Sequence, residues 1–267
     1  MTMAGTNDRW SDLRPRVLSA LVMVTVGGFD IWAGGVLFAL MVVAVIGGMM
    51  WELSRLTAGP GRNHSLWLGG LAALALAFVL WSDAPWAILA LVVPPLAGLF
   101  VPRRDRVIFF LYALVILGTG LSLVAMRLTL GLAPFLWLLA VVVVSDILGY
   151  FVGRILGGPK FWPAISPKKT WSGTAAGWIG AAAVGLGFWA FGTGTVHLLW
   201  ASPLIAFAGQ MGDIAESAIK RRAGVKDASS LIPGHGGLMD RFDALAFAAI
   251  VTAILHLLVP LFPLVKV

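Results

Sequence analysis

Two pairs of carboxylates in the C-terminal half of the chain could bind a metal ion. Asp213 and Glu216 are three residues apart, and Asp240 and Asp243 have the same spacing, so each pair would share one face of a helix. Carboxylates gathered without a cation would repel one another. The chain has no cysteine and four histidines, and oxygen ligands suit Mg²⁺, which usually takes one or two carboxylates together with substrate phosphates. The spacing therefore indicates a magnesium site that handles phosphate.

The loop between the two pairs suits phosphate binding. It reads KRRAGVKDASSLIPGHGGLMDRFD from Lys220 to Asp243. Its basic side chains can neutralise phosphate oxygens, and its glycines let backbone N–H groups approach an anion closely. His235 lies between glycines and could either contact a phosphate or fix the loop, and both roles stay open.

A second polar segment, Ser166-Pro-Lys168-Lys169-Thr170, precedes another apolar run. Two lysines and a hydroxyl group near a helix N-terminus could cradle a polyphosphate. The same residues could instead anchor a lipid headgroup.

Three carboxylates lie inside apolar runs, namely Asp146, Asp213 and Glu216. An ionised carboxylate at mid-bilayer costs at least roughly 2.5–3.5 kcal/mol, so such residues usually face a water-filled cavity or a bound cation. Solvated interface charge is a sufficient interpretation for the acidic residues in loops or at helix ends. These are Asp8, Asp12, Asp30, Glu52, Asp83 and Asp105.

The composition indicates a membrane protein that would position these residues. Of 267 residues, 60% are hydrophobic and 12% are charged, whereas soluble domains carry about 25% charged residues. We predict an all-α fold, a polytopic bundle of about nine transmembrane helices in one integral membrane domain (1–267). Residues 1–140 would form the N-terminal transmembrane helices, and residues 141–267 the catalytic helices and cytoplasmic motif loops. The apolar runs are Val17–Phe29, Ile31–Trp51, Leu66–Trp81, Ala84–Val101, Val107–Met126, Pro134–Leu156, Thr174–Phe191, Leu199–Ile219 and Leu245–Val265.

Basic residues predict the orientation. All of the 19 Lys and Arg residues except Arg127 and Lys266 flank one set of alternating boundaries. The positive-inside rule places that side and the N-terminus in the cytoplasm, and nine crossings would place the C-terminus outside. Arg14–Phe29 superficially resembles a cleaved signal peptide, but no small-x-small cleavage site precedes the next run, so we expect a retained helix. The net charge of +7 is thereby explained without a nucleic-acid partner.

A stripe of small residues marks the seventh run. Gly173, Gly177, Ala181 and Gly185 recur at every fourth position. Such a stripe lets a membrane helix pack closely against a neighbour. We read it as a packing feature rather than a site.

The motif pattern resembles a known family. Ser217-Ala-Ile-Lys-Arg, four residues, Lys226-Asp, then Pro233-Gly-His-Gly-Gly-Leu-Met-Asp-Arg-Phe-Asp243 looks like the signature of phosphatidate cytidylyltransferases, also called CDP-diacylglycerol synthases. The segments 145–154, 166–171 and 210–217 resemble the family as well. Ser172 stands where the family pattern has Glu, and the Thr-x-Ala expected near 147–149 is missing. For residues 1–140 the resemblance rests on hydropathy and on the Arg-Val-Leu-Ser-Ala sequence at Arg16.

The resemblance implies a reaction and a setting. Members convert CTP and phosphatidate into CDP-diacylglycerol and pyrophosphate, need Mg²⁺, and have been described with a mixed divalent and K⁺ site. We therefore expect a multi-pass enzyme of a bacterial inner membrane, in contact with membrane lipid, organised as a homodimer, with an active site facing the cytoplasm.

The expected roles follow from the motif positions. For metal binding we expect Asp213, Glu216, Asp240 and Asp243, with Asp146 as either a further ligand or an orienter of a motif lysine. For catalysis we expect Lys168, Lys169, Lys220, Arg221, His235 and Asp240. For substrate binding we expect Ser166, Lys168, Lys169, Thr170, Ser217, Lys220, Arg221, Lys226, Gly236, Gly237 and Arg241.

Two other classes of protein are weighed. An ion-coupled transporter would explain intramembrane carboxylates, but the two halves show no inverted repeat and the polar residues cluster in the second half. A CDP-alcohol phosphotransferase would carry a DG-x-x-A-R run, which is absent. A polyprenol kinase would transfer the γ-phosphate and release a nucleoside diphosphate, so its products would distinguish it.

Overall fold

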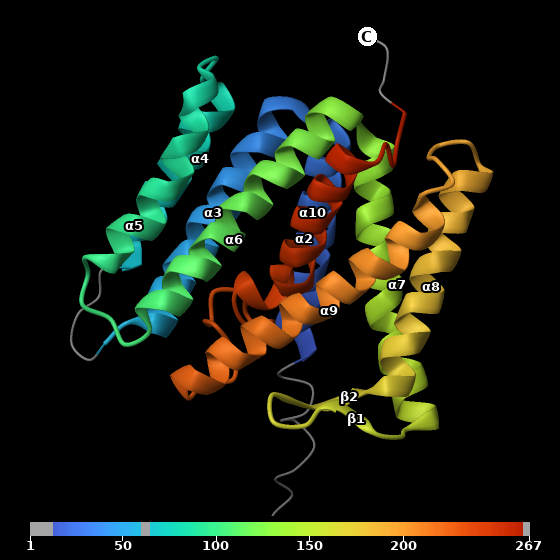
Figure 1. Ribbon diagram of the computed structural model, residues 1–267. Helices are drawn as coiled ribbons and strands as arrows, with labels where there is room; N and C mark the ends of the chain where they lie inside the picture. The colour runs from blue at the N-terminus through green and yellow to red at the C-terminus, as the bar shows by residue number, and fades with distance from the viewer. Residues whose placement is uncertain (1–12, 60–64, 264–267) are drawn as a thin grey trace, which may run out of the picture.

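The computed structural model describes residues 13–59 and 65–263, with side chains from residue 16 onward. It is a bundle of tilted helices with one short hairpin (Figure 1). The first half contains α2 (Leu13–Ala33), α3 (Gly35–Thr57), α4 (Ser65–Trp81), the 3₁₀ helix η1 (Pro85–Val92), α5 (Val93–Leu99), α6 (Arg106–Ala125) and the π-helical turn η2 (Met126–Leu130). The second half contains α7 (Leu132–Leu156), β1 (Lys160–Trp162), β2 (Ser166–Thr170), α8 (Trp171–Ala190), α9 (Leu198–Ala223) and α10 (Met239–Leu258).

Each predicted apolar run is largely helical, as expected of a polytopic, helical membrane protein, but Ile31–Trp51 crosses the break at Gly34 between α2 and α3, and Leu245–Val265 extends beyond the end of α10 at Leu258. Within residues 13–59 and 65–263, six helical segments are long and apolar enough to cross a membrane by length and composition. They are Arg16–Ala33, Gly35–Thr57, Arg106–Leu130, Leu132–Leu156, Trp171–Ala190 and Met239–Leu258. α4 and the combined segment Pro85–Leu99 are shorter than the roughly 20 residues of a full span. α9 is not among the described segments that meet this criterion. The predicted count of nine crossings therefore stays a prediction.

The fourth run is not one α-helix, and its prolines explain why. Pro94 and Pro95 stand at the start of α5, where η1 ends. Proline has no N–H to donate to the preceding turn, so an α-helical ladder cannot continue through this point. The run is divided into a 3₁₀ helix and a short α-helix.

The small-residue stripe packs as predicted. Gly173 and Gly177 of α8 lie against α7, and a Cβ atom on Gly177 would come within 2.7 Å of Ser145 Oγ. Gly185 lies against Leu198 of α9. α8 thus packs closely against both α7 and α9. Because β2 leads directly into α8, this packing also places the hairpin beside α7 and α9. Thr170, the last residue of β2, accepts a 3.2 Å hydrogen bond from Gly173 N and caps α8.

The Lys168–Lys169 segment differs from the expected loop. β1 pairs with β2 in an antiparallel hairpin in which Lys160 faces Thr170. The hairpin gives the two lysines a fixed backbone beside α7 and α8 (Figure 1).

The boundaries predicted to be basic gather at one end of the bundle. Arg222, at the end of α9, lies 2.9 Å from Asp105 at the start of α6, and this hydrogen bond holds the pKa of Asp105 below its ordinary value. Arg104 N donates to Thr57 O at the end of α3. Arg127 lies at the other end of α2, where its Nε donates to Ile31 O at 2.9 Å. The predicted cations at Arg9, Arg62 and Lys266 are outside the described residues, as is the end of the last apolar run.

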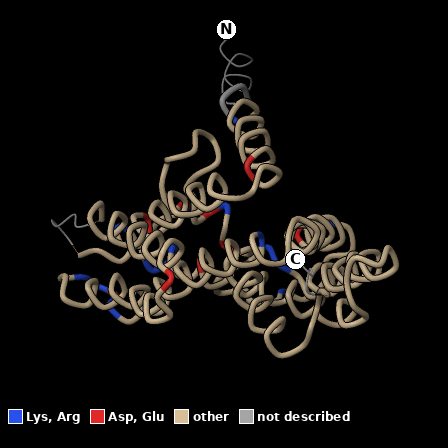
Figure 2. Tube along the Cα trace, turned by 90° about the horizontal axis from the view of Figure 1, so that it is seen from above, with Lys and Arg blue, Asp and Glu red and all other residues tan. Residues whose placement is uncertain are grey.

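The N-terminal helix stands apart from the others. Figure 2 shows α2 projecting from the bundle, and only 6% of its span is buried. Its first turns nevertheless contact the loop between α9 and α10, called the motif loop below, because Ser19 Oγ donates to Pro233 O at 2.9 Å. The loop is therefore held from the N-terminal half of the chain.

Candidate active site

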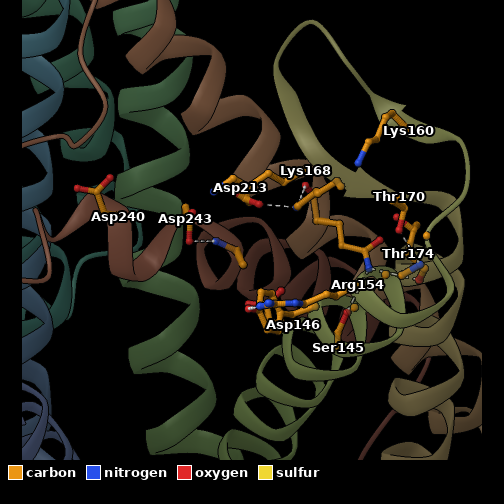
Figure 3. A pocket seen from close by; sticks show the side chains of 18 residues that line it. Ser145, Asp146, Arg154, Lys160, Lys168, Thr170, Thr174, Asp213, Asp240 and Asp243 are labelled. Atoms are coloured by element: carbon orange, nitrogen blue, oxygen red, sulfur yellow. Dashed lines mark hydrogen bonds and ion pairs between the residues drawn. The ribbon is translucent and has the colours of Figure 1, made fainter.

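A polar cavity of about 800 Å³ lies among α7, the hairpin, α8, α9 and α10 (Figure 3). In Figure 3, Asp240 and Asp243 lie on one side of the cavity, and Lys160 and Thr170 on the other. The predicted site residues that line it are Asp146, Lys168, Lys169, Thr170, Asp213, Asp240 and Asp243. Its other polar lining residues are Ser145, Tyr150, Arg154, Lys160, Thr174 and Gln210.

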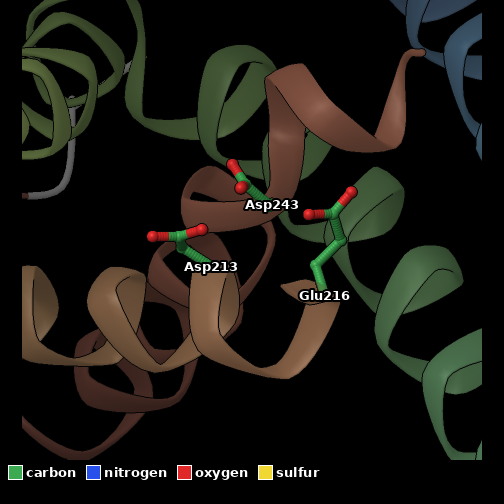
Figure 4. Close-up of side chains that lie close together, drawn as sticks. All are labelled: Asp213, Glu216 and Asp243. Atoms are coloured by element: carbon green, nitrogen blue, oxygen red, sulfur yellow. The ribbon is translucent and has the colours of Figure 1, made fainter. Parts of the chain in front are cut away.

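Three carboxylates meet beside this cavity, and two of them, Asp213 and Asp243, line it. Asp213 and Glu216 of α9 and Asp243 of α10 each offer an oxygen, and these oxygens all lie within 4.8 Å of one another (Figure 4). The two helices can approach because residue 212 is glycine. A Cβ atom there would collide with the carbonyl oxygen of Asp243. The spacing predicted from the sequence thus produces a group of three carboxylates.

The chemistry of this group fits a divalent cation. Opposite ligands in a Mg²⁺ octahedron are about 4.2 Å apart, so oxygens within 4.8 Å need little movement to share one ion. Glu216 is fully buried, and its Oε1 has no hydrogen-bond partner among the described residues. A buried carboxylate oxygen without a donor is costly unless a cation or water meets it. The donors are hard oxygens of the kind that Mg²⁺ prefers.

Asp240, a predicted ligand, does not belong to this group. Its Oδ2 accepts hydrogen bonds from Gly237 N at 2.7 Å and Ala228 N at 2.8 Å. Its Oδ1 lies 2.5 Å from Lys220 Nζ. The carboxylate therefore orders the motif loop, although it also lines the cavity.

Two of the predicted lysines are paired with carboxylates. Lys169 forms an ion pair with Asp213 and donates to Gln210 O at 3.3 Å. Lys220 lies 2.5 Å from both Glu216 Oε2 and Asp240 Oδ1. Both ammonium groups offset the negative charge of the site.

Three other cations line the cavity without an acidic partner in the described part of the chain. They are Lys168, Lys160 and Arg154, of which Arg154 donates to Tyr150 Oη at 2.7 Å. Lys160 and Arg154 were not among the predicted site residues. Their positions in the sequence could have indicated them, because Arg154 lies at the end of α7 and Lys160 at the start of β1, just before the Lys168–Lys169 segment.

Glu216, Lys220 and the rest of the predicted residues do not line the cavity. Ser217 Oγ donates to Asp213 Oδ1 at 3.5 Å, and His235 Nδ1 lies 2.8 Å from Ser19 Oγ. Gly236 and Gly237 lie against Asp240 and Glu52 respectively. Ser166, Arg221, Lys226 and Arg241 are also outside the lining.

Gln210 is a site residue that the predicted set omitted. Its side chain is 6% exposed, its Nε2 donates to Ser145 Oγ at 3.2 Å, and its Oε1 accepts from Trp178 Nε1 at 3.0 Å. It thus joins α7, α8 and α9 at the wall of the cavity. An amide within an apolar run, three residues before Asp213, was the available signal.

The interpretation of the remaining acidic residues was wrong at two positions. Glu52 is fully buried and Asp30 is 4% exposed, so neither is a solvated interface charge. Glu52 accepts three hydrogen bonds from the motif loop and the start of α10. Asp83 is exposed and Asp105 is paired, as interface charges are. Asp8 and Asp12 lie outside the described residues.

Comparison with known proteins identifies the family. The sequence model of the cytidylyltransferase family matches residues 14–259. The phosphatidate cytidylyltransferase of Pseudomonas aeruginosa is 35% identical over 268 residues, covering 91% of this chain and 96% of that protein. That of Brucella abortus biovar 1 is 35% identical over 248 residues, covering 90% and 91%. That of Helicobacter pylori strain J99 is 31% identical, covering 89% of each. The chain belongs to the cytidylyltransferase family.

Proposed function

We propose that this protein transfers the cytidylyl group of CTP to phosphatidate, forming CDP-diacylglycerol and pyrophosphate. One observation carries the proposal. In a polytopic membrane protein of the cytidylyltransferase family, a cluster of three carboxylates adjoins a cavity that two of them, Asp213 and Asp243, line together with a set of cations. Relatives that cover nine-tenths of the chain carry the name phosphatidate cytidylyltransferase.

The two substrates come from different phases, and the position of the cavity suits both. CTP is dissolved in the cytosol, whereas phosphatidate keeps its acyl chains in the bilayer. The hairpin that lines the cavity lies at the same end of the bundle as the C-terminal end of α9, which carries Arg222 (Figure 1). By the positive-inside rule that end faces the cytoplasm, in our proposal on the inner membrane of a bacterium.

The reaction needs little proton transfer. A phosphate oxygen of phosphatidate attacks the α-phosphorus of CTP and forms a new P–O bond. The bond from that phosphorus to the bridging oxygen breaks, and pyrophosphate leaves with the electron pair. Because the attacking oxygen is already anionic, no strong base is required. Catalysis then consists mainly of bringing anions together and neutralising charge.

The cluster of three carboxylates would hold Mg²⁺, with ligands from Asp213, Glu216 and Asp243. Bound there, Mg²⁺ would neutralise phosphate oxygens of the substrates. Asp146 lines the same cavity but lies outside the group of three. A second cation such as K⁺ is proposed from the family resemblance alone.

The cations divide into two sets. Lys169 and Lys220 are engaged by carboxylates, so they position the acidic group. Lys168, Lys160 and Arg154 face the cavity without acidic partners among the described residues, so they are the groups able to bind phosphate oxygens. A triphosphate carries several anionic oxygens, and this second set matches them with charge-assisted hydrogen bonds.

A homodimer is part of the proposal. The family resemblance suggests it, and α2 offers a long apolar surface of which 6% is buried. Cross-linking in native membranes tests it directly, since a monomer at every cross-linker concentration would contradict it.

The activity is tested with the purified protein in detergent. CTP, phosphatidate and Mg²⁺ are supplied, and products are identified by mass spectrometry. We expect CDP-diacylglycerol and pyrophosphate in equal amounts, and neither when the divalent cation is chelated. Formation of CDP with a phosphorylated lipid would indicate a kinase instead. Absence of any CTP consumption with well-folded protein would refute the proposal.

A further inference from the structure

The start of α10 obtains its hydrogen-bond acceptors from a distant helix. The first N–H groups of a helix have no partner within it, and Leu238, the residue before α10, has no polar side chain to accept them. Leu238 N donates to Glu52 Oε1 at 2.9 Å, and Met239 N donates to Glu52 Oε2 at 2.7 Å. Glu52 belongs to α3, 186 residues earlier than Leu238. Its carboxylate also lies at the positive end of the helix dipole of α10.

The motif loop is built around this carboxylate. Ser229 Oγ donates to Glu52 Oε1 at 2.6 Å. Gly237 leaves the room that the carboxylate occupies, because a Cβ atom at that position would lie 2.7 Å from Glu52 Cδ. Gly237 was predicted to bind phosphate. In the structure, its missing side chain instead leaves space for the Glu52 carboxylate.

The anchor is rigid. The side chain of Glu52 is fully buried, and so are those of its neighbours Met49, Met50 and Leu53 on the same helix. Both carboxylate oxygens are used; the hydrogen bond from Met239 N is buried, and those from Ser229 and Leu238 N are partly buried. Such bonds hold their geometry more firmly than those at a surface.

The first turns of α10 also carry Asp240 and Asp243. Asp240 accepts from Gly237 N and Ala228 N, and Asp243 stands three residues further along α10. A shift at the start of α10 would move Asp243 relative to Asp213 and Glu216, whose oxygens lie within 4.8 Å of it.

We propose that Glu52 is a positioning residue that holds the start of α10, so that Asp243 lies close enough to Asp213 and Glu216 to complete the cluster of three carboxylates. Glu52 does not line the cavity and therefore acts through α10 rather than on substrate. The inference rests on the proposed function for its kinetic test, but not for its binding test.

The variant Glu52→Gln tests the role. The amide keeps the size of the side chain but sets an N–H group against one of the backbone donors. Supporting groups around a metal site typically change affinity by 10–100-fold, so we expect the Mg²⁺ concentration for half-maximal activity to rise by about that factor. Binding of Mn²⁺ to the substrate-free protein, followed by electron paramagnetic resonance, should weaken by a similar factor.

Thr57→Val is the matched control. Thr57 is a buried polar residue of the same helix, and its hydroxyl bonds Leu53 O and accepts from Arg103. It should lower the melting temperature without changing Mg²⁺ dependence or Mn²⁺ binding. Equal shifts in the two variants, or no shift in Glu52→Gln, would overturn the proposal.

A second variant covers loss of folding. If Glu52→Gln does not fold, Ser229→Ala removes one of the three donors and should shift both readouts in the same direction by a smaller factor. Unchanged Mn²⁺ binding in that variant overturns the proposal. If the wild-type protein lacks cytidylyltransferase activity, the proposed function fails, while the Mn²⁺ comparison still decides the role of Glu52.

Discussion

Lys169 on β2 forms an ion pair with Asp213 on α9, whereas its neighbour Lys168 faces the cavity without an acidic partner in the described chain. Two adjacent lysines of one motif therefore have different surroundings. Lys169 competes with any cation for Asp213, and Lys168 is available to a phosphate. This difference leads to a paired prediction.

Lys168→Gln should raise the KM for CTP or phosphatidate by about tenfold to a hundredfold, the factor expected from losing one hydrogen bond from a charged group. Mn²⁺ binding to the substrate-free protein should not change. Lys169→Gln should instead tighten Mn²⁺ binding, because Asp213 loses its competing cation, while turnover falls. Steady-state kinetics and Mn²⁺ titration check both. Identical Mn²⁺ affinities in the two variants would contradict the division of roles.

Asp243→Asn and Asp240→Asn should also differ. Asp243 belongs to the group of three, so its loss should abolish Mn²⁺ binding as well as turnover. Asp240 is engaged by Lys220, Gly237 and Ala228, so Asp240→Asn should lower turnover by about tenfold to a hundredfold while Mn²⁺ still binds. If Asp240→Asn binds no Mn²⁺ and Asp243→Asn does, the two assignments are reversed.

Sequence spacing predicted part of this site and missed part for physical reasons. The three-residue spacing of Asp213 and Glu216 in an apolar helix indicated a shared face, and the structure has it. Asp240 and Asp243 have the same spacing, but α10 begins at Met239, so Asp240 lies in the first turn and bonds back to the loop. Spacing cannot reveal where a helix begins with enough precision to separate these cases.

Contacts between residues that lie far apart in the chain could not be predicted from the sequence. Glu52 looked like an interface charge because it ends an apolar run, and only the fold brings it to Leu238 and Met239. The sequence did not predict the hairpin around Lys168, because its β-pairing involves only three to five residues per strand. The helices, by contrast, were predictable because each needs a continuous apolar stretch.

Close packing of α8 gives a prediction about stability. Gly173→Ala would place a Cβ atom against the carbonyl oxygen of Gly149, so the melting temperature should fall. Gly187→Ala, in the same helix, would meet nothing within 4 Å and should raise helix propensity by up to about 1 kcal/mol. Tryptophan fluorescence during heating in detergent measures both. A Gly187→Ala variant as destabilised as Gly173→Ala would argue against the packing account.

The orientation is tested by labelling, since the chain has no native cysteine. Ser230→Cys, in the exposed part of the motif loop, should react with a membrane-impermeant maleimide only after cells are opened. Thr193→Cys, in the turn after α8, should react in intact cells. Labelling of Ser230→Cys but not Thr193→Cys in intact cells would contradict the proposed topology and indicate the opposite orientation.

The fate of each CTP phosphate tests the central claim most directly. The purified protein is given phosphatidate, Mg²⁺ and CTP labelled at either the α- or the γ-phosphate, and the lipid and aqueous products are separated. We predict that the α-label appears in the lipid and the γ-label in pyrophosphate. Transfer of the γ-label to lipid, with the α-label left in CDP, would contradict cytidylyl transfer.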